Sequence, residues 1–115
     1  MLTKSKLYLF LLLTLGVAFL SLTRAHAGAP MSVNANEVVI ENFSYQPTTL
    51  TVAPGTKVTW VNRDDEPHTV TDTNKHFNSK ALDTGDRFST AFTQPGTYNY
   101  YCALHPKMTG QVIVK

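Results

Sequence analysis

The sequence has a single cysteine among 115 residues, so it holds no pair that could form an intramolecular disulfide. It has four histidines and no tract rich in histidine or methionine. Its 10 basic and eight acidic residues form no basic stripe, which argues against nucleic-acid binding. After residue 27 no segment keeps a helical period for more than a turn or two, and there are no repeats. These absences argue against a helical or nucleic-acid-binding domain, and they leave the cysteine free, bound to a metal or paired with another chain.

The first 27 residues have the composition of a secretory signal peptide. Lys4 and Lys6 precede an apolar run over 7–22, and the small-x-small pattern of a cleavage site follows at 25–27. We therefore expect cleavage after Ala27 and export, to the periplasm or another extracytoplasmic compartment, with no membrane attachment of the mature chain. A retained membrane anchor is the alternative, although the run is short for a span of about 20 residues.

Three segments are predicted: the signal peptide over 1–27, a flexible leader over 28–36 and one domain over 37–115. The mature chain would have 88 residues, with seven basic and eight acidic side chains and a net charge of −1. A domain of this size has a limited core, so a bound metal would add to its stability. A free thiol is vulnerable in an oxidising compartment, and a metal bound to it would explain why it is tolerated.

Short alternating segments separated by turn signals indicate an all-β domain. Strands are expected around 38–40 and at 49–53, 57–62, 68–71, 87–92, 98–102 and 110–115. Residues 43–47 are expected to break the first strand, and Pro54-Gly55 marks a turn. The pattern predicts a β-sandwich or small barrel, with Trp60, Phe88 and Phe92 in its core.

The most informative stretch is Cys102-Ala103-Leu104-His105-Pro106-Lys107-Met108. A thiolate, an imidazole and a thioether favour copper over magnesium or calcium, and a trigonal His₂Cys site with a weak axial methionine is the blue-copper arrangement. A strand could not direct Cys102, His105 and Met108 at one ion, but a tight loop could, and Pro106 favours a loop. His68 can supply the missing histidine.

Each of these residues has a simpler explanation when taken alone. A lone cysteine is commonly a small buried hydrophobe, and a methionine near a strand usually belongs to the core. The ordered set of donors within seven residues, with His68 upstream, favours the metal site. His76 is the other histidine of the predicted domain that could bind a metal, but its polar surroundings indicate an exposed loop residue.

With these residues identified, the region 37–115 resembles the cupredoxin family of type 1 blue copper proteins, and among them the small amicyanin-type members of bacteria. Three motifs carry the resemblance. They are residues 43–62, through Pro47, Leu50, Val52, Gly55, Val58, Trp60 and Asn62; the run Pro67-His68-Thr69-Val70; and residues 95–102 followed by His105 and Met108.

The resemblance implies a Greek-key β-sandwich with one type 1 copper at one end. The implied ligands are two equatorial imidazoles, a thiolate and an axial thioether, from His68, His105, Cys102 and Met108 in that order. The chain departs from the family at Thr69, where asparagine is common and braces the ligand loop. A threonine there could still donate a hydrogen bond, but with shorter reach.

The function implied by the resemblance is one-electron transfer by a small monomeric protein that is not an enzyme, with copper alternating between Cu(I) and Cu(II). Redox partner proteins would dock on the apolar surface near Leu104, His105 and Pro106. Because Pro106 has no N–H to donate near the sulfur, we expect it to raise the reduction potential. The acidic run 64–66 is interpreted as a solvated loop or, alternatively, as a feature that steers a basic partner.

Two other kinds of protein use similar ligands. A periplasmic copper carrier, chaperone or resistance protein is the alternative function, although carriers tend to use the Met-rich or His-rich tracts that this chain lacks. A multicopper oxidase or copper nitrite reductase needs further copper centres, built from more histidines than the three that follow residue 27. A binuclear copper centre needs a second cysteine.

Overall fold

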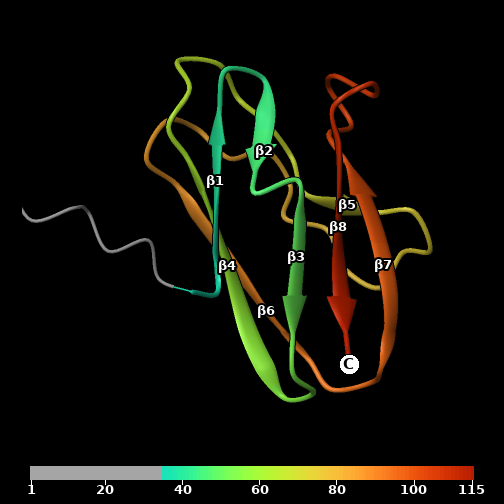
Figure 1. Ribbon diagram of the computed structural model, residues 1–115. Helices are drawn as coiled ribbons and strands as arrows, with labels where there is room; N and C mark the ends of the chain where they lie inside the picture. Colours follow the sequence, from blue (N-terminus) through green and yellow to red (C-terminus); the bar gives the residue numbers. More distant parts are fainter. Residues whose placement is uncertain (1–34) are drawn as a thin grey trace, which may run out of the picture. The chain divides into compact units, whose positions relative to one another are not determined.

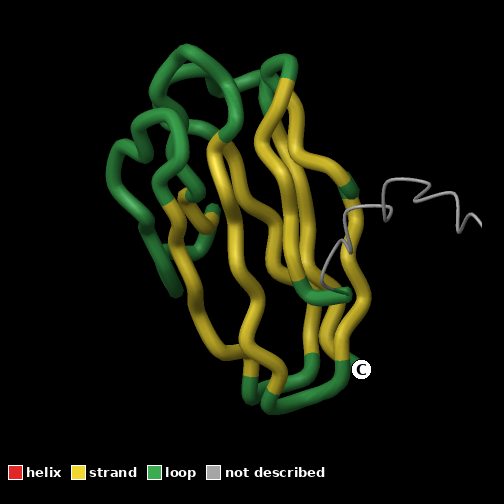
Figure 2. The backbone as a smooth tube through the Cα atoms, turned by 90° about the vertical axis from the view of Figure 1, so that its left-hand side faces the viewer, coloured by secondary structure: helices red, strands yellow, loops and turns green. Residues whose placement is uncertain are grey.

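The computed structural model describes residues 35–115; the predicted signal peptide and all but the last two residues of the predicted leader lie outside the described residues. Two four-stranded sheets pack face to face, with loops at both ends of the strands (Figures 1 and 2). The strands are β1 (Glu37–Glu41), β2 (Ser44–Gln46), β3 (Thr49–Val52), β4 (Thr56–Asn62), β5 (Thr71–Asp72), β6 (Arg87–Phe92), β7 (Gly96–Tyr101) and β8 (Thr109–Val114). No helix in this part of the chain is long and apolar enough to cross a membrane.

The sheets have the strand orders β2-β1-β4-β6 and β3-β8-β7-β5. The pairs β1–β4 and β3–β8 are parallel, and the other pairs are antiparallel. Both parallel pairs join strands that are far apart in the sequence, so the chain passes repeatedly from one sheet to the other. This arrangement confirms the prediction of an all-β Greek-key sandwich.

The core lies between the sheets and is centred on Trp60. Val58 and Trp60 lie two residues apart on one face of β4, and both are fully buried, as their alternation predicts. The Trp60 ring has four aromatic neighbours at centroid distances of 5.5–6.2 Å, which are Phe77, Phe88, Phe92 and Tyr100. The predicted core positions of Trp60 and Phe92 are confirmed, and Phe88 is partly buried and packs against the core.

The first strand ends before the predicted break at 43–47, but the break is only a two-residue turn at Asn42 and Phe43, after which β2, which was not predicted, pairs with β1. Both turn residues have positive φ, 52° and 54°, as the tight turns of β-hairpins require. Asparagine tolerates this conformation, but a phenylalanine there costs on the order of 1–3 kcal/mol. The two backbone N–H groups both donate to the carboxylate of Asp64, at 2.7 and 2.9 Å. A charged acceptor from a distant loop thus holds a turn that Phe43 disfavours.

The predicted strand at 68–71 is mostly absent. Regular pairing begins only at Thr71, in β5, and His68 forms an isolated bridge. The backbone N–H groups of this segment are bound to side chains and not to a neighbouring strand. The N–H of Thr69 donates to Sγ of Cys102, and the N–H of Val70 donates to the hydroxyl of Ser79. Side-chain acceptors replace the ladder partners of a strand, and they fix this segment beside the ligand loop.

Candidate metal centre

The loop that joins β7 to β8 carries three of the predicted ligands and is closed by three backbone hydrogen bonds. The N–H of Cys102 donates to the carbonyl of Met108 (3.0 Å), that of His105 to Cys102 (3.1 Å), and that of Met108 to His105 (2.9 Å). Each bond joins two of these residues, so the loop turns back on itself. The prediction that 102–108 forms a tight loop is confirmed.

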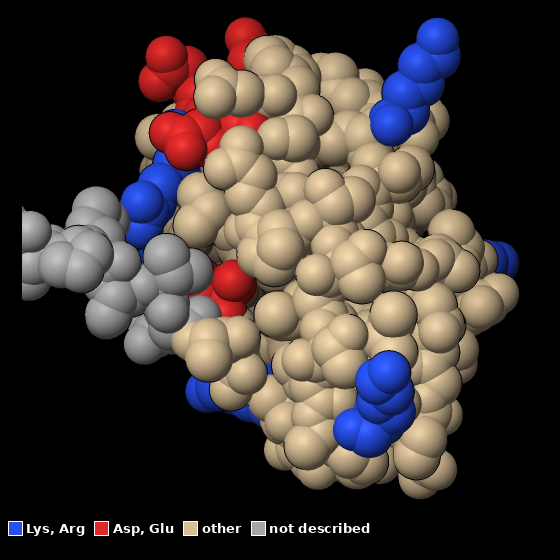
Figure 3. All heavy atoms as spheres, viewed as in Figure 1, with Lys and Arg blue, Asp and Glu red and all other residues tan. Residues whose placement is uncertain are grey.

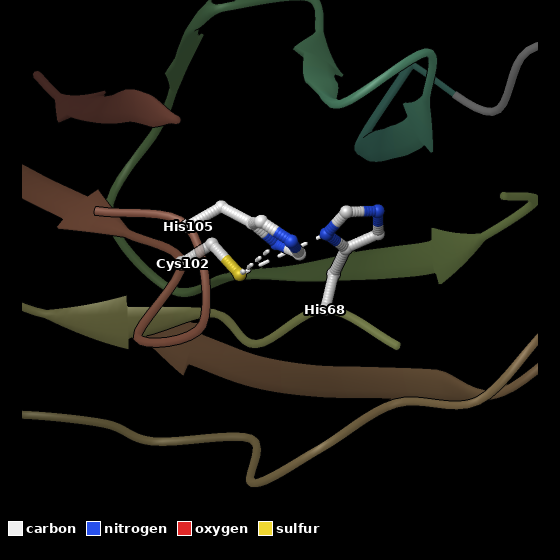
Figure 4. Close-up of side chains that lie close together, drawn as sticks. All are labelled: His68, Cys102 and His105. Carbon is white, nitrogen blue, oxygen red and sulfur yellow. Dashed lines mark hydrogen bonds between the residues drawn. The ribbon is translucent and has the colours of Figure 1, made fainter. Parts of the chain in front are cut away.

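Two histidine rings point at the cysteine sulfur (Figure 4). Sγ of Cys102 lies 3.7 Å from Nδ1 of His68 and 3.6 Å from Nδ1 of His105. The three donor atoms lie within 4.8 Å of one another, and this is the one such group of His, Cys, Asp or Glu side chains in residues 35–115. His68 and Cys102 are fully buried, whereas His105 is partly exposed.

This donor set fits one transition-metal ion. Two ligands that each lie about 2.0–2.3 Å from a common ion, in tetrahedral or trigonal directions, are separated by about 3.5 Å, which is close to both sulfur–nitrogen distances in the structure. One thiolate with two imidazoles is a soft donor set that suits copper. The residues brought together here are therefore those that a type 1 copper would require in its trigonal plane.

Met108 is 6 % exposed and packs in the core cluster together with Cys102. Its backbone bonds with Cys102 and His105 close the end of the ligand loop. Its role as axial ligand stays a prediction.

Asp64 was not expected in the site, because its sequence context indicated a solvated acidic run. Its Oδ2 lies 2.8 Å from Nε2 of His68, and only 11 % of its side chain is exposed. Burial raises the pKa of this carboxyl, but hydrogen bonds from the Phe43 and Asn42 amides and from His68 outweigh that effect and hold the pKa below its ordinary value of 3.8. The carboxylate accepts, so Nε2 carries the proton and Nδ1 presents its lone pair toward Cys102. A carboxylate four residues before the histidine was the available signal.

Thr69 connects the first-histidine segment to the ligand loop. Its hydroxyl oxygen accepts a hydrogen bond from the N–H of Ala103 at 2.7 Å and lies 2.9 Å from the hydroxyl of Thr71. Its own N–H donates to Sγ of Cys102 at 3.3 Å, the one backbone amide of residues 35–115 that does so. The shorter threonine therefore still braces the loop, although as an acceptor where we expected a donor.

The carbonyl of Thr69 is held as well. The phenol of Tyr45 donates to it at 2.6 Å. Burial raises the pKa of Tyr45 far above its ordinary value of 10.0, and the nearby Cys102 and Tyr100 side chains add to the shift. Tyr45 is therefore a neutral hydrogen-bond donor that fixes the backbone next to His68.

The exposed side of the site is apolar. Phe43 and Leu104 are the two large hydrophobic side chains of residues 35–115 that lie mostly exposed, at 52 % and 51 %. The Phe43 ring meets His68 and His105 edge-on, with centroid distances of 5.2 and 5.1 Å and interplanar angles close to perpendicular. Sequence reasoning missed Phe43, because nothing in its local pattern connects it with residues 60 positions later.

His76 lies outside the site, as predicted. Its side chain is 59 % exposed, and its Nδ1 lies 2.7 Å from the buried carboxylate of Asp72. It takes no part in the group formed by His68, Cys102 and His105.

Comparison with known proteins places these residues in a family. A family model described as a cupredoxin-like domain matches residues 11–114. Amicyanin from Paracoccus denitrificans is 34 % identical over 99 residues, which cover 77 % of this chain and 72 % of that protein. The chloroplastic plastocyanin of Chlamydomonas reinhardtii is 31 % identical over 118 residues, with 86 % and 76 % covered.

Solved structures of cupredoxins show the same similarity. A purple cupredoxin from Nitrosopumilus maritimus is 38 % identical with a TM-score of 0.65, covering 69 % of this chain and 98 % of that one. The Cu(I) form of an amicyanin variant is 33 % identical with a TM-score of 0.65, covering 69 % and 80 %. A copper-containing nitrite reductase from Thermus scotoductus is 30 % identical with a TM-score of 0.65, but the 69 % of this chain that matches covers only 22 % of that enzyme.

Proposed function

Because the chain belongs to the cupredoxin family, we propose that it is a small one-electron carrier whose copper ion is bound by His68, Cys102, His105 and Met108. Bound copper supplies a one-electron couple between Cu(II) and Cu(I). The observation that carries the proposal is the convergence of two imidazole nitrogens on a single buried thiol sulfur. Export is part of the proposal, on the composition of residues 1–27, and so is a monomeric state.

The surrounding residues hold the ligands in place. Asp64 orients the His68 ring, Thr69 fixes the start of the ligand loop, and Tyr45 fixes the backbone of Thr69. Ligands that are held by the protein in both redox states move little when an electron arrives or leaves, which keeps the reorganisation small. The N–H of Thr69 also stabilises negative charge on Cys102.

We place the docking surface at the exposed side of His105. Leu104, His105 and Pro106 form its predicted part, and the exposed ring of Phe43 extends it. Contiguous exposed apolar side chains commonly mark interaction sites. In the face shown in Figure 3, acidic side chains gather at the upper left and a basic side chain stands at the upper right, at the end to which the β1–β2 turn belongs in Figure 1. A redox partner with an apolar contact surface and basic side chains facing the acidic side would fit this end.

A carrier of electrons is favoured over an enzyme. Residues 35–115 contain one candidate metal group, and the copper nitrite reductase that they resemble is a much longer chain. A carrier of copper ions uses the same ligands, so the two kinds of carrier are separated by how the bound metal behaves.

The test is the absorption spectrum of the purified chain after addition of Cu(II), with Cys102→Ser as the matched variant. We expect an intense visible thiolate-to-copper band that disappears on reduction, returns on oxidation and is missing in Cys102→Ser. Cys102→Ser is isosteric apart from the sulfur, so a lost band reports the thiolate and not a lost fold, which circular dichroism checks separately.

Two results would overturn the proposal. Binding of Cu(I) alone, or binding without the visible band, would favour transport of copper ions. No binding of copper in either oxidation state would remove the basis of both functions.

A further inference from the structure

The carboxylate of Asp64 receives three hydrogen bonds from two parts of the site. Oδ1 accepts the N–H of Asn42 at 2.7 Å, and Oδ2 accepts both the N–H of Phe43 at 2.9 Å and Nε2–H of His68 at 2.8 Å. Asn42 and Phe43 form the β1–β2 turn, whereas His68 is a proposed ligand. One side chain therefore links the turn to the metal centre.

Asp64 is itself held by a buried framework. Its N–H donates to Oδ1 of Asn62, a side chain with no exposed surface. The amide nitrogen of Asn62 donates in turn to the carbonyls of Glu66 and Leu82, at 2.9 and 2.8 Å. Leu82 is paired through two backbone hydrogen bonds with His68. The loop that presents Asp64 is thus anchored to the same segment as the histidine that it contacts.

The turn needs this anchor. Phe43 has a φ of 54°, a conformation that a bulky residue avoids unless its surroundings impose it. Local sequence does not impose it, because neither turn residue is glycine. The imposed turn has one visible result: the Phe43 ring stands at the exposed surface with its contacts on His68 and His105.

We propose that Asp64 is a positioning residue that fixes, through one carboxylate, both the ring orientation of His68 and the placement of Phe43 as a cover over the two imidazoles. The proposal rests on the proposed function for the identity of the metal. It follows that the docking surface and the buried ligand share one hydrogen-bond acceptor. A partner that displaces Phe43 on binding would therefore alter the hydrogen bond between Asp64 and His68.

No neutral side chain of the same size replaces Asp64. A carboxylate offers about four acceptor positions, whereas the amide of asparagine has one oxygen and presents two N–H groups on the other side. Asp64→Asn therefore keeps the shape but turns a donor toward Nε2 of His68 or toward an amide of the turn. Either placement breaks at least one of the three hydrogen bonds.

The first measurement uses metal-free wild-type protein, so it does not depend on any metal. Nitrogen chemical shifts of the His68 ring are expected to show the tautomer with the proton on Nε2, and proton–proton contacts are expected between the Phe43 ring and both histidine rings. A His68 ring protonated on Nδ1 and not on Nε2, or a Phe43 ring without these contacts, would overturn the proposal even if no variant folds.

The second measurement compares Asp64→Asn with Asp65→Asn, which removes the same charge from an exposed neighbouring carboxylate. In Asp64→Asn, we expect the Phe43 contacts to be lost and the His68 nitrogen shifts to move toward a mixture of tautomers. In Asp65→Asn both are expected to remain. If Asp64→Asn retains the wild-type contacts and tautomer, Asp64 positions neither group.

Phe43→Gly separates the two halves of the proposal. Glycine accepts positive φ, so the turn and its bonds to Asp64 remain while the ring is removed. The Nε2–H tautomer of His68 is expected to survive in Phe43→Gly and to fail in Asp64→Asn; loss of the tautomer in Phe43→Gly as well would mean that the ring, and not the carboxylate, orients His68.

A copper-loaded measurement adds the redox readout. The carboxylate stabilises positive charge on the ligand side of the site, and so favours Cu(II). Asp64→Asn is expected to raise the ratio of Cu(I) to Cu(II) affinity about tenfold, which corresponds to about 59 mV upward for a one-electron couple. A potential equal to that of Asp65→Asn would overturn the electrostatic part of this role. If no copper binds, the proposed function fails while the metal-free results on Asp64 stand.

Discussion

The two histidines of the candidate centre are held in contrasting ways. His68 is fully buried, its outer nitrogen is bound to Asp64, and its backbone pairs with a neighbouring segment. His105 is partly exposed on a seven-residue loop and has the apolar rings and side chains of the surface beside it. One histidine belongs to the folded framework and the other to the contact surface. A site that exchanges electrons with other proteins requires both, a rigid half and an accessible half.

The largest expected difference between the halves concerns folding. His68→Ala removes a buried ring and one of the three hydrogen bonds to the Asp64 carboxylate, so we expect a loss of about 2–4 kcal/mol in the unfolding free energy of the metal-free protein. His105→Ala removes a partly exposed ring, and we expect a loss within about 1 kcal/mol. Urea unfolding of both metal-free variants measures the difference. Equal losses would show that the two halves are not distinct.

Thr69 connects the His68 segment to the loop that carries His105, so removing its hydroxyl should weaken the contact between the two halves of the site. Thr69→Val keeps the shape but leaves the N–H of Ala103 without its acceptor, at a cost of about 1–3 kcal/mol. Thr69→Ser keeps the hydroxyl and serves as the control. Hydrogen exchange of the Ala103 amide is expected to speed up in the valine variant alone. Unchanged exchange there would mean that the loop does not depend on this brace.

High pH should lower the stability of the buried half of the site, to which His68 and Tyr45 belong. The raised pKa of Tyr45 means that the folded state keeps its proton where the unfolded chain loses it, so this stability is complete below about pH 10 and is lost as the pH rises above it. Burial also raises the pKa of Tyr100 to about 12, which adds to the same trend. We expect metal-free stability to fall by about 1.4 kcal/mol per pH unit for each such group. Tyr45→Phe should flatten the decline, and an identical slope would contradict this assignment.

Pro106, in the exposed half of the site, is expected to influence the reduction potential of the bound copper. Pro106→Ala introduces an N–H into the ligand loop, which we expect to reach the sulfur of Cys102. One hydrogen bond to a thiolate is worth about 0.5–1.5 kcal/mol, or roughly 20–60 mV for a one-electron couple. We expect the reduction potential to fall by this amount in voltammetry of the copper-loaded protein. An unchanged or higher potential would show that the missing N–H of Pro106 does not tune the site.

The smallest expected effect on the molecule itself comes from Leu104. Leu104→Ser removes exposed apolar surface, so unfolding free energy should change by less than about 0.5 kcal/mol and the visible band should stay in place. The rate of electron exchange between two copies of the protein, measured by line broadening, is expected to fall severalfold. An unchanged rate would place the contact surface elsewhere.

Local pattern was sufficient for the framework of the fold. The alternation at Val58 and Trp60 predicted a buried face, and the short spacing from Cys102 to Met108 predicted a tight loop that brings the thiol and imidazole together. The Greek-key topology was predicted from the resemblance to a family, because the periodicity of apolar residues does not determine which strands pair. The assignment of the four ligands and the axial role of Met108 remain predictions.

What the sequence did not reveal depends on contacts between distant segments. Phe43 adopts a conformation that its residue type disfavours, so propensity predicted the end of the first strand but not the hairpin that pairs β2 with it. Asp64 looked solvated because its three donors come from residues 4, 21 and 22 positions away. The stretch after His68 lost its strand pairing to side-chain acceptors. In each case a tertiary hydrogen bond overrode a local preference.

The dependence of the β1–β2 turn on Asp64 has a consequence for the order of folding. A hairpin with a favourable turn nucleates locally, but this one lacks its acceptor until the chain beyond β4 has been placed. We therefore expect the pairing of β1 with β2 to be absent from the folding transition state, with substitutions in the turn changing the unfolding rate and leaving the folding rate almost unaltered. The Phe43 ring would then be the last part of the site to reach its place over the two histidines during folding, and the first to leave it during unfolding.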